Sequence, residues 1–338
     1  MEEGTYGRVA KYGNYAIKQF KDIDPDHGVE QNMIREMMVY TRCGGKDGIC
    51  DGRFRMIGNS IELVMEQGTC DLEDYCYQLE KEKRERGFMT ILRKICIGVW
   101  NLHQEGFVHR DIKPNNIIIC KDKSIKLIDF GFSNEQHMAT SDYEFSESLV
   151  FKDETITFKS DVCQIGSTML FFLKRKYYNL QNIYNRIDTL NIPDEFARII
   201  ERMIDKDVEK RISMEGVLEL LNISPEYTPK IISPTIKPNK EYENLEEVLD
   251  NVFSLRLRMR KKTLDQIELM MEYVHDIFVR EYGWVFTMNA CALIASKMYE
   301  GGSYLVPSEI TKNEEECAQL LTLEKKILER LEFLIPLS

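Results

Sequence analysis

Four residues in the middle of the chain have side chains that suit phosphoryl transfer. The segment HRDIKPNN (109–116) contains Asp111, which can orient the proton of a substrate hydroxyl, and Lys113, which can stabilise the transferring phosphoryl group. Asn116 offers a neutral oxygen to Mg²⁺, and Asp129, in the motif IDFG, is predicted to be the main Mg²⁺ ligand. Phosphoryl transfer needs little covalent chemistry from a protein, but it needs metal ions, a lysine and an oriented nucleophile. The joint pattern favours catalysis over unrelated capping residues.

A second group of residues near the N-terminus predicts a site for nucleotide phosphates. Gly4 and Gly7 lie in EEGTYGRV, where small residues in a strand-turn-strand let backbone N–H groups approach phosphates. Lys18, on the following predicted strand, can neutralise the α- and β-phosphates. Glu36 lies in a predicted helix (29–42) and can hold that lysine in place. The alternatives are an ordinary hairpin for the glycines and a surface salt bridge for the ion pair.

The elements that must position these residues change in character along the chain. Residues 5–20 alternate around a Gly-Asn pair, which is typical of a hairpin, and IELVM (61–65) is a further predicted strand. From about residue 70 helical spacing dominates, broken by two short apolar strands at 116–119 and 125–129. A strand-rich start followed by a larger helical part predicts an α+β fold.

A second change, in composition and apolar periodicity, separates the C-terminal part of the chain from the rest. Residues 224–242 contain four prolines and no apolar periodicity, which indicates an extended linker. After it, apolar stripes recur at helical spacing, and the small, all-apolar segment 290–295 is typical of a buried central helix. The sequence therefore predicts a first domain at 1–223 and a small all-α domain at 243–338.

Composition excludes several classes of protein. The net charge of -11 argues against a nucleic-acid-binding surface, which is normally basic. No stretch reaches the apolar length that spans a bilayer, and the N-terminus lacks a signal core, so we expect a cytoplasmic or nuclear protein without membrane contact. The nine cysteines show no metal-binding spacing and are predicted to be reduced, mostly structural thiols.

In their order and spacing, the motifs over about residues 1–223 resemble the signatures of protein kinases. The resemblance implies a bilobal fold, with a β-rich N-lobe at about 1–67 and a helical C-lobe at about 68–223. It also implies ATP and Mg²⁺ as cofactors. Lys113 after HRD resembles the Ser/Thr branch rather than the tyrosine branch, which implies transfer of the γ-phosphate to protein Ser/Thr hydroxyls.

The resemblance also implies contacts to ATP that the motifs alone do not identify. Met65 would be the gatekeeper, and the backbone from Glu66 through Gln67 to Gly68 would face the adenine. Asp71 would lie near the ribose. The adenine ring itself would be enclosed by three apolar side chains: Val9, Ala16 and Ile118.

Within the kinases, the chain resembles the cyclin-dependent group. EEGTYG is close to their glycine loop, and NMIRE (32–36) resembles the end of their cyclin-contacting helix. Residues 290–300 and 322–333 resemble two helices of a single cyclin box, fused here to the kinase. In that likeness Lys297 and Glu324 match the cyclin pair that grips the cyclin-contacting helix through its backbone.

This second likeness implies that the cyclin-like module docks on the helix carrying Glu36 and activates the kinase in cis. One alternative is a pseudokinase or scaffold whose module binds another kinase. Another is a kinase whose helical tail only adds stability. A simpler interpretation is that Lys297 and Glu324 are solvated charges on helix surfaces.

The chain also departs from the kinase pattern. Glu2 replaces the first loop glycine, and the short segment before Thr140 has no counterpart of the usual activating threonine. We predict that Glu135 supplies the anion that Arg110 normally finds in a phosphate group, so that activity does not need phosphorylation. The short loops resemble those of streamlined viral kinases.

Overall fold

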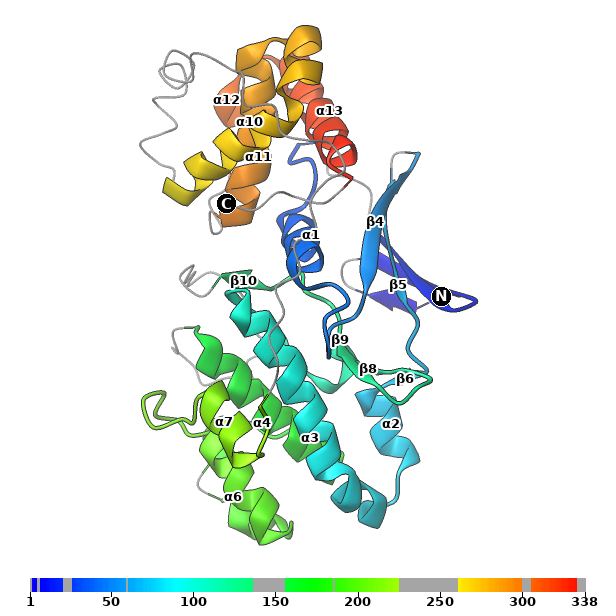
Figure 1. Cartoon of the computed structure of the whole chain (residues 1–338), viewed down its shortest axis with the longest axis vertical. Helices are drawn as coiled ribbons and strands as arrows, with labels where there is room; N and C mark the ends of the chain where they lie inside the picture. The colour runs from blue at the N-terminus through cyan, green and yellow to red at the C-terminus, as the bar shows by residue number, and fades with distance from the viewer. Residues whose placement is uncertain are drawn as a thin grey trace. The chain divides into compact units, whose positions relative to one another are not determined.

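The computed structural model describes residues 2–4, 7–20, 26–58, 60–135, 156–184, 186–224, 261–299 and 305–332. The chain forms two compact units, shown with their helices and strands in Figure 1. The first unit comprises Met1–Arg42, Gly52–Met65 and Ile231–Ser338, and the second comprises Cys43–Asp51 and Glu66–Lys230. The predicted linker at 224–242 lies, apart from its first residue, outside the described residues.

The first unit contains a five-stranded sheet with the strand order β1-β2-β3-β5-β4. Its strands are β1 (Glu2–Gly4), β2 (Gly7–Tyr12), β3 (Tyr15–Phe20), β4 (Gly52–Ile57) and β5 (Ser60–Glu66). β2 and β3 form an antiparallel hairpin, and Gly13 in its turn has a φ of 60°, which glycine adopts without steric cost. The predicted hairpin and the predicted strand at 61–65 are confirmed.

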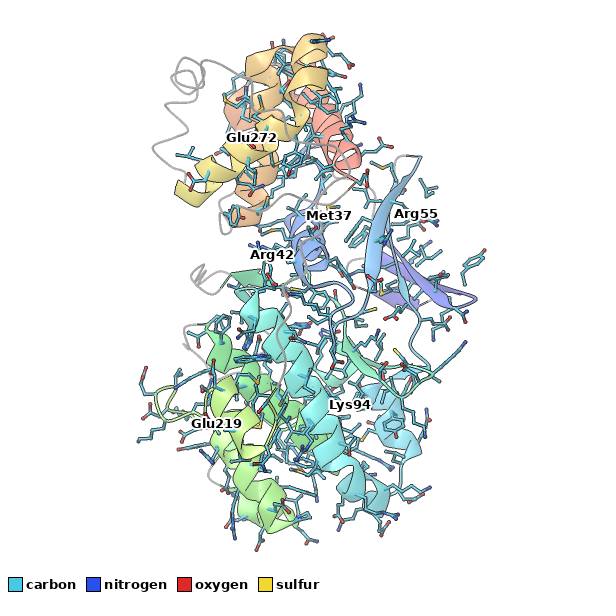
Figure 2. The ribbon with its side chains drawn as sticks, viewed as in Figure 1. Met37, Arg42, Arg55, Lys94, Glu219 and Glu272 are labelled. Carbon is cyan, nitrogen blue, oxygen red and sulfur yellow. The ribbon has the colours of Figure 1, made fainter. Side chains whose placement is uncertain are left out.

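Helix α1 (Gln31–Cys43) carries Glu36 and is buried on more than one face. Four of its apolar side chains are at most 2% exposed: Met33, Ile34, Met37 and Met38. Tyr40 on α1 packs edge-on against Phe54 of β4, with 6.0 Å between ring centroids. Figure 2 labels Met37 and Arg42 on this helix. The buried side chains of α1 also include the polar or charged residues Arg35, Glu36 and Thr41, so the helix needs apolar and polar partners.

The described residues after 260 are helical and belong to the first unit. They form α10 (Lys261–Tyr282), α11 (Trp284–Tyr299), α12 (Pro307–Ile310) and α13 (Glu314–Arg330). α11 packs against both α10 and α13, and every side chain from Ala290 to Ala295 is fully buried. The predicted buried central helix is therefore confirmed, and its small residues let the neighbouring helices approach closely.

The second unit is mainly helical. Its helices and 3₁₀ turns are α2 (Leu72–Gln78), α3 (Lys81–Gln104), η1 (Pro114–Asn116), α4 (Phe158–Lys174), α5 (Leu180–Ile183), η2 (Ile187–Leu190), α6 (Asp194–Met203) and α7 (Met214–Leu220). α4 packs against α3 and α6 and is buried along almost all of its length. A capping box formed by Thr157 and Ser160 fixes its first turn.

Short strands in the second unit flank the segments that carry the predicted site residues. β6 (Cys70–Asp71), β8 (Ile117–Ile119) and β9 (Ile125–Leu127) form one sheet, and β7 (Phe107–Val108) pairs with β10 (Asn134–Glu135). The sequence predicts the second strand as far as residue 129, but β9 ends at Leu127. Asp129 has a φ of 64°, which an extended strand does not accommodate.

The described helices and the cysteines can be compared with two expectations drawn from composition. No helix within the described ranges is long and apolar enough to cross a membrane. All nine cysteines are free. Burial raises the pKa of Cys50 and of Cys96 to about 12, so both thiols stay protonated at neutral pH and are poor nucleophiles.

Candidate active site

Lys18 and Glu36 form an ion pair within the first unit. Nζ of Lys18 lies 2.9 Å from Oε2 of Glu36, and the two side chains are 11% and 1% exposed. β3 carries the lysine and α1 the glutamate, so the pair joins the sheet to the helix. The Lys18 ammonium also lies 5.0 Å from the ring centroid of Phe20, within the range of a cation–π contact.

The glycine segment has a strand on either side of Thr5 and Tyr6. Gly4 and Gly7 pair directly across β1 and β2. Thr5 and Tyr6, which connect them, lie outside the described residues. Glu2, where kinases have their first loop glycine, pairs with Val9 in β1 without interrupting the ladder.

Three of the residues predicted to contact ATP share one face of the sheet. Val9 pairs with Lys18 across β2 and β3, so their side chains point to the same side. Ala16 precedes Lys18 by two residues on β3 and therefore also points to that side. Met65 is the last residue of β5 that belongs to this unit, and it is 7% exposed.

The second unit brings together the residues of the segment HRDIKPNN. Nζ of Lys113 lies 2.7 Å from Oδ2 of Asp111, and Nδ2 of Asn116 donates to the same oxygen at 2.8 Å. Nδ2 of Asn116 also donates to the Asp111 carbonyl oxygen at 2.8 Å. The Asp111 carboxylate is therefore held from two sides and is 7% exposed.

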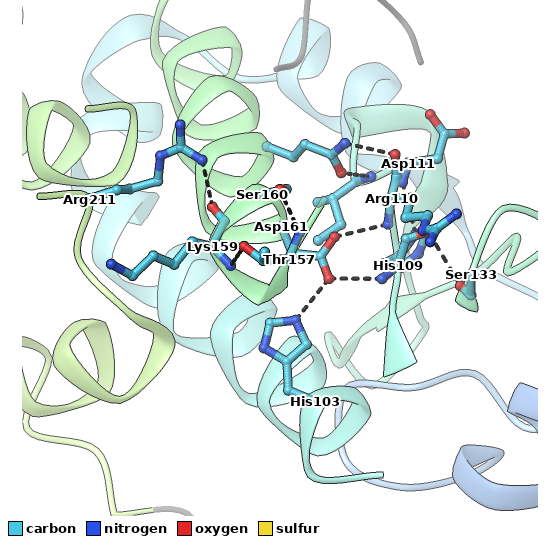
Figure 3. Close-up of polar contacts among 12 residues, drawn as sticks. His103, His109, Arg110, Asp111, Ser133, Thr157, Lys159, Ser160, Asp161 and Arg211 are labelled. Carbon is cyan, nitrogen blue, oxygen red and sulfur yellow. Dashed lines mark hydrogen bonds and ion pairs between the residues drawn. The ribbon is translucent and has the colours of Figure 1, made fainter. Parts of the chain in front are cut away.

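Helix α4 holds the backbone that precedes and follows Asp111. Oδ2 and Oδ1 of Asp161 accept hydrogen bonds from the backbone N–H groups of His109 at 2.8 Å and Arg110 at 2.9 Å. Gln164 accepts from the N–H of Ile112 at 2.8 Å and donates to the Arg110 carbonyl at 2.7 Å. Figure 3 shows Asp161 between the catalytic segment and α3. Arg110 has a φ of 71°, and these bonds hold it in that sparsely populated conformation.

The sequence did not point to two partners in this support, His103 and Gln164. His103 at the end of α3 lies 2.8 Å from Oδ2 of Asp161 through its Nε2 and stacks on Phe158. Gln164 lies one turn after Asp161 on the same face of α4. Asp161 and Gln164 are two polar residues three positions apart in a mostly apolar helix, and this pattern could have indicated Gln164. No local pattern indicates His103.

Asn116 and Asp129 have the donor atoms for a magnesium ion. Both N–H groups of the Asn116 amide are used on Asp111, which leaves the amide oxygen as a donor of lone pairs. The N–H of Ile128 donates to the Asn116 carbonyl at 3.0 Å and thereby brings the end of β9, with Asp129, beside η1. An amide oxygen and a carboxylate suit Mg²⁺, which completes its shell with phosphate and water oxygens.

The segment that follows β5 is held against the small sheet of the second unit. The Glu66 carboxylate forms an ion pair with Lys126 of β9 and also accepts from the N–H of Asp51 at 3.4 Å. Gly68 lies so close to Ile118 that an added Cβ would be 2.7 Å from the Ile118 Cβ. Glycine at this position therefore lets the backbone approach the residue predicted to lie beneath the adenine.

Asp71 caps helix α2. Its Oδ1 accepts from the N–H of Asp74 at 2.7 Å, and its Oδ2 accepts from Nδ2 of Asn115 at 3.3 Å. Burial raises the pKa of the Asp71 carboxyl above its ordinary value, and the nearby charges of Asp74 and Glu73 raise it further. The structure thus gives the predicted ribose-contacting residue a capping role as well.

Lys297 and Glu324 meet in the first unit at the segment that leads into α1. They form an ion pair in which both side chains are 0% exposed. Nζ of Lys297 donates to the His27 carbonyl at 2.8 Å, and Oε2 of Glu324 accepts from the N–H of Val29 at 3.1 Å. Gly28 between them has a φ of 76°, and an added Cβ would lie 2.2 Å from Oε2 of Glu324. The solvated charges considered as an alternative are therefore excluded.

Several predicted residues lie outside the described part of the chain. Thr140 belongs to the undescribed range 136–155, and the side chain of Glu135 also lies outside the described part of the chain. The backbone of Glu135 pairs with Phe107 in β10 and β7, three residues before Arg110. The predicted phosphate substitute therefore stays a prediction.

Comparison with known proteins identifies the class. The protein kinase domain is matched by residues 2–221 of this chain, which therefore belongs to the protein kinase family. A mitogen-activated protein kinase kinase of Aspergillus fumigatus is 31% identical over 46% of this chain and 33% of its own length. The cyclin-dependent kinase 4 homolog of Caenorhabditis elegans is 23% identical over 47% of this chain and 43% of its own length.

A third relative is matched over nearly its whole length. The probable cell division protein kinase of Encephalitozoon cuniculi is 23% identical over 64% of this chain and 93% of its own length. In the Aspergillus fumigatus and Caenorhabditis elegans relatives, by contrast, the matched region spans 33% and 43% of the relative. These comparisons establish the kinase family for the region before the linker.

The buried Asp161 provides a test of how the catalytic segment is held. We expect Asp161→Asn to lower the free energy of unfolding by about 2–4 kcal/mol, because the amide turns an N–H group toward buried N–H donors. Chemical denaturation of the variant measures this loss. Asp207→Asn is the matched control, since Asp207 accepts the Glu209 N–H but is 45% exposed, and it should change little. Equal stability of wild type and Asp161→Asn would contradict this role.

Proposed function

We propose that the protein is an active serine/threonine kinase that transfers the γ-phosphate of ATP to protein hydroxyls. The observation that carries this proposal is the arrangement of Asp111, whose carboxylate is held by Lys113 and Asn116. A carboxylate fixed in this way can orient one substrate hydroxyl, and the adjacent ammonium can neutralise charge on the transferring group. Serine/threonine kinases among the relatives support a protein as the acceptor.

The remaining predicted residues have complementary roles in the proposal. Lys18, held by Glu36, would bind the α- and β-phosphates, and the backbone N–H groups between Gly4 and Gly7 would cover the phosphates. Asn116 and Asp129 would hold Mg²⁺, which when bound neutralises charge that develops on the phosphate oxygens. Val9, Ala16, Met65, Gly68 and Ile118 would form the apolar adenine site, with Asp71 at the ribose and the Glu66 backbone facing the base.

Phosphate transfer is the direct test of this function. We expect the full chain to transfer labelled γ-phosphate from ATP and Mg²⁺ to a basic serine-containing protein, because all the predicted catalytic groups are present. Asp129→Ala should reduce the rate to below about 1% of wild type, since it removes the charged metal ligand. Transfer at the same background rate by both proteins would support the alternative, a pseudokinase that serves as a binding scaffold.

We further propose that the C-terminal helices act as a cyclin-like module that activates the kinase in cis. The support is the pair of hydrogen bonds by which Lys297 and Glu324 bind the backbone of the segment before α1. These hydrogen bonds lie at the N-terminal end of the helix that carries Glu36, so they would fix that helix and the Lys18–Glu36 pair. A covalent tether raises the effective concentration of such a module to roughly millimolar, so that even a weak contact is occupied.

Gly28 tests the activating role without removing a charge from the buried pair. We expect Gly28→Ala to reduce phosphate transfer roughly tenfold or more, because the methyl group would displace Glu324 and loosen α1. Gly13→Ala is the matched control: Gly13 also has a positive φ, but nothing lies within 4 Å of its added Cβ. Similar rates for both variants would favour a tail that only stabilises the fold.

A further inference from the structure

Tyr177 follows the end of α4 in the second unit and is half-buried on that helix. Its ring packs on Phe171 of α4, with 4.4 Å between the ring centroids. The hydroxyl group reaches two acceptors, Oε2 of Glu73 at 3.3 Å and Oδ1 of Asn115 at 3.4 Å. Burial raises the pKa of Tyr177, and the charge of Glu73 raises it further, so the phenol keeps its proton. That single proton is shared between the two acceptors.

Asn115 connects this hydroxyl to Asp71. It is the exposed residue of η1, between Pro114 and Asn116, which are both buried. Its Oδ1 accepts from Tyr177, and its Nδ2 donates to Oδ2 of Asp71 at 3.3 Å. A rotation of the amide by 180° would turn its oxygen toward the Asp71 carboxylate and lose that bond. The hydroxyl of Tyr177 therefore favours the one orientation in which Asn115 donates to Asp71.

The Asp71 carboxylate needs such a donor because its surroundings are acidic. Burial raises its pKa, the charges of Asp74 and Glu73 act in the same direction, and the hydrogen bond from Asn115 opposes them. Oδ1 is already used at the start of α2, where it accepts from the N–H of Asp74. The Asn115 amide therefore fixes the second oxygen of the carboxylate, Oδ2.

The position of Asp71 gives this orientation a possible use in the reaction. Asp71 pairs with Ile118 across β6 and β8, so it lies beside the residue proposed to contact the adenine ring. Its proposed contact is with the ribose. A carboxylate aimed by fixed neighbours binds a hydroxyl group better than one that must first be ordered.

We propose that Tyr177 is a positioning residue that acts through the Asn115 amide and aims the Asp71 carboxylate at the ribose hydroxyls of the bound nucleotide. The inference rests on the proposed function, in which Asp71 lies at the ribose. It assigns a role in recognising the sugar to a residue far from the nucleotide motifs in sequence. A tyrosine that only stabilised the fold would affect all nucleotides alike, whereas this role affects those that carry ribose hydroxyls.

A nucleotide that lacks these hydroxyls provides the test. The quantity to measure is the Kd of 2′,3′-dideoxy-ATP divided by the Kd of ATP, obtained by calorimetry on the full chain with Mg²⁺. We expect Tyr177→Phe to lower this ratio by roughly threefold, as the loss of one weak hydrogen bond would. The ring keeps its packing on Phe171 in this variant, so the thermal midpoint should stay close to wild type.

A double-mutant cycle with Asn115→Ala shows whether Tyr177 acts through Asn115. Asn115→Ala alone should also lower the ratio. In that background Tyr177→Phe should change it by less than about 1.5-fold, because the link is already lost. Tyr77→Phe is the matched control and should leave the ratio unchanged. Tyr77 contacts the same Phe171 ring edge-on at 6.3 Å, but its hydroxyl has no hydrogen bond to any residue that the structure describes.

Four results would overturn the proposal. The first is a ratio close to one in the wild type, and the second is an unchanged ratio in Tyr177→Phe. The third is an equal loss of affinity for both nucleotides in Tyr177→Phe, which would indicate a general structural role. The fourth is the absence of binding by either nucleotide. The expected ratios in a chain that transfers no phosphate would count against the kinase function alone.

The link between Tyr177 and Asn115 can also be measured without any nucleotide. In protein with ¹⁵N-labelled asparagine, the side-chain amide signal of Asn115 is identified by its loss in Asn115→Ala. We expect this signal to shift in Tyr177→Phe and to stay in place in Tyr77→Phe, whether or not the chain transfers phosphate. An unmoved signal in Tyr177→Phe would contradict the link even in an active kinase.

Discussion

The contact between Lys18 and Glu36 is the interaction on which the nucleotide half of the site depends. Its two partners come from different elements, β3 and α1, so the pair exists only while the helix keeps its position and rotation. A shift of α1 by a single residue would rotate Glu36 by about 100° around the helix axis. The hydrogen bonds of Lys297 and Glu324 to the segment before α1 hold one end of that helix.

A second constraint acts on the catalytic segment of the other unit. Arg110 and Asp129 both have left-handed backbone conformations, with φ values of 71° and 64°, which non-glycine residues rarely adopt. The buried carboxylate of Asp161 holds the first through backbone hydrogen bonds, and the link between Ile128 and Asn116 supports the region before the second. These strained backbone conformations direct Asp111 and Asp129 out of the short loops and strands that carry them.

The sequence contains the functional groups of the site but only part of what positions them. Asp111, Lys113 and Asn116 lie within six consecutive residues, so their spacing alone predicts one cluster, and the alternation around Gly13 predicts its hairpin. The partners of Asp161 and of the Tyr177 hydroxyl could not be predicted. These contacts join residues more than fifty positions apart, and several involve backbone atoms that every residue carries.

The C-terminal helices illustrate the same limit. Their apolar stripes predict helices, and the buried segment around Ala292 is where the pattern places it. The contact of Lys297 and Glu324 with the backbone around Gly28 spans about three hundred residues of chain and is visible only through resemblance or structure. The shortness of the segment before Thr140, by contrast, is plain in the sequence.

The most direct measurement of the central claim is native-state hydrogen exchange at the Val29 amide. Its N–H donates to a fully buried carboxylate, that of Glu324, just before the start of α1. We expect this amide to exchange as slowly as the core amides of α13, because it opens only when the helices separate from α1. Exchange as fast as that of an exposed loop amide would show that the hydrogen bond from Val29 to Glu324 is not maintained in solution, and that α1 must be positioned in another way.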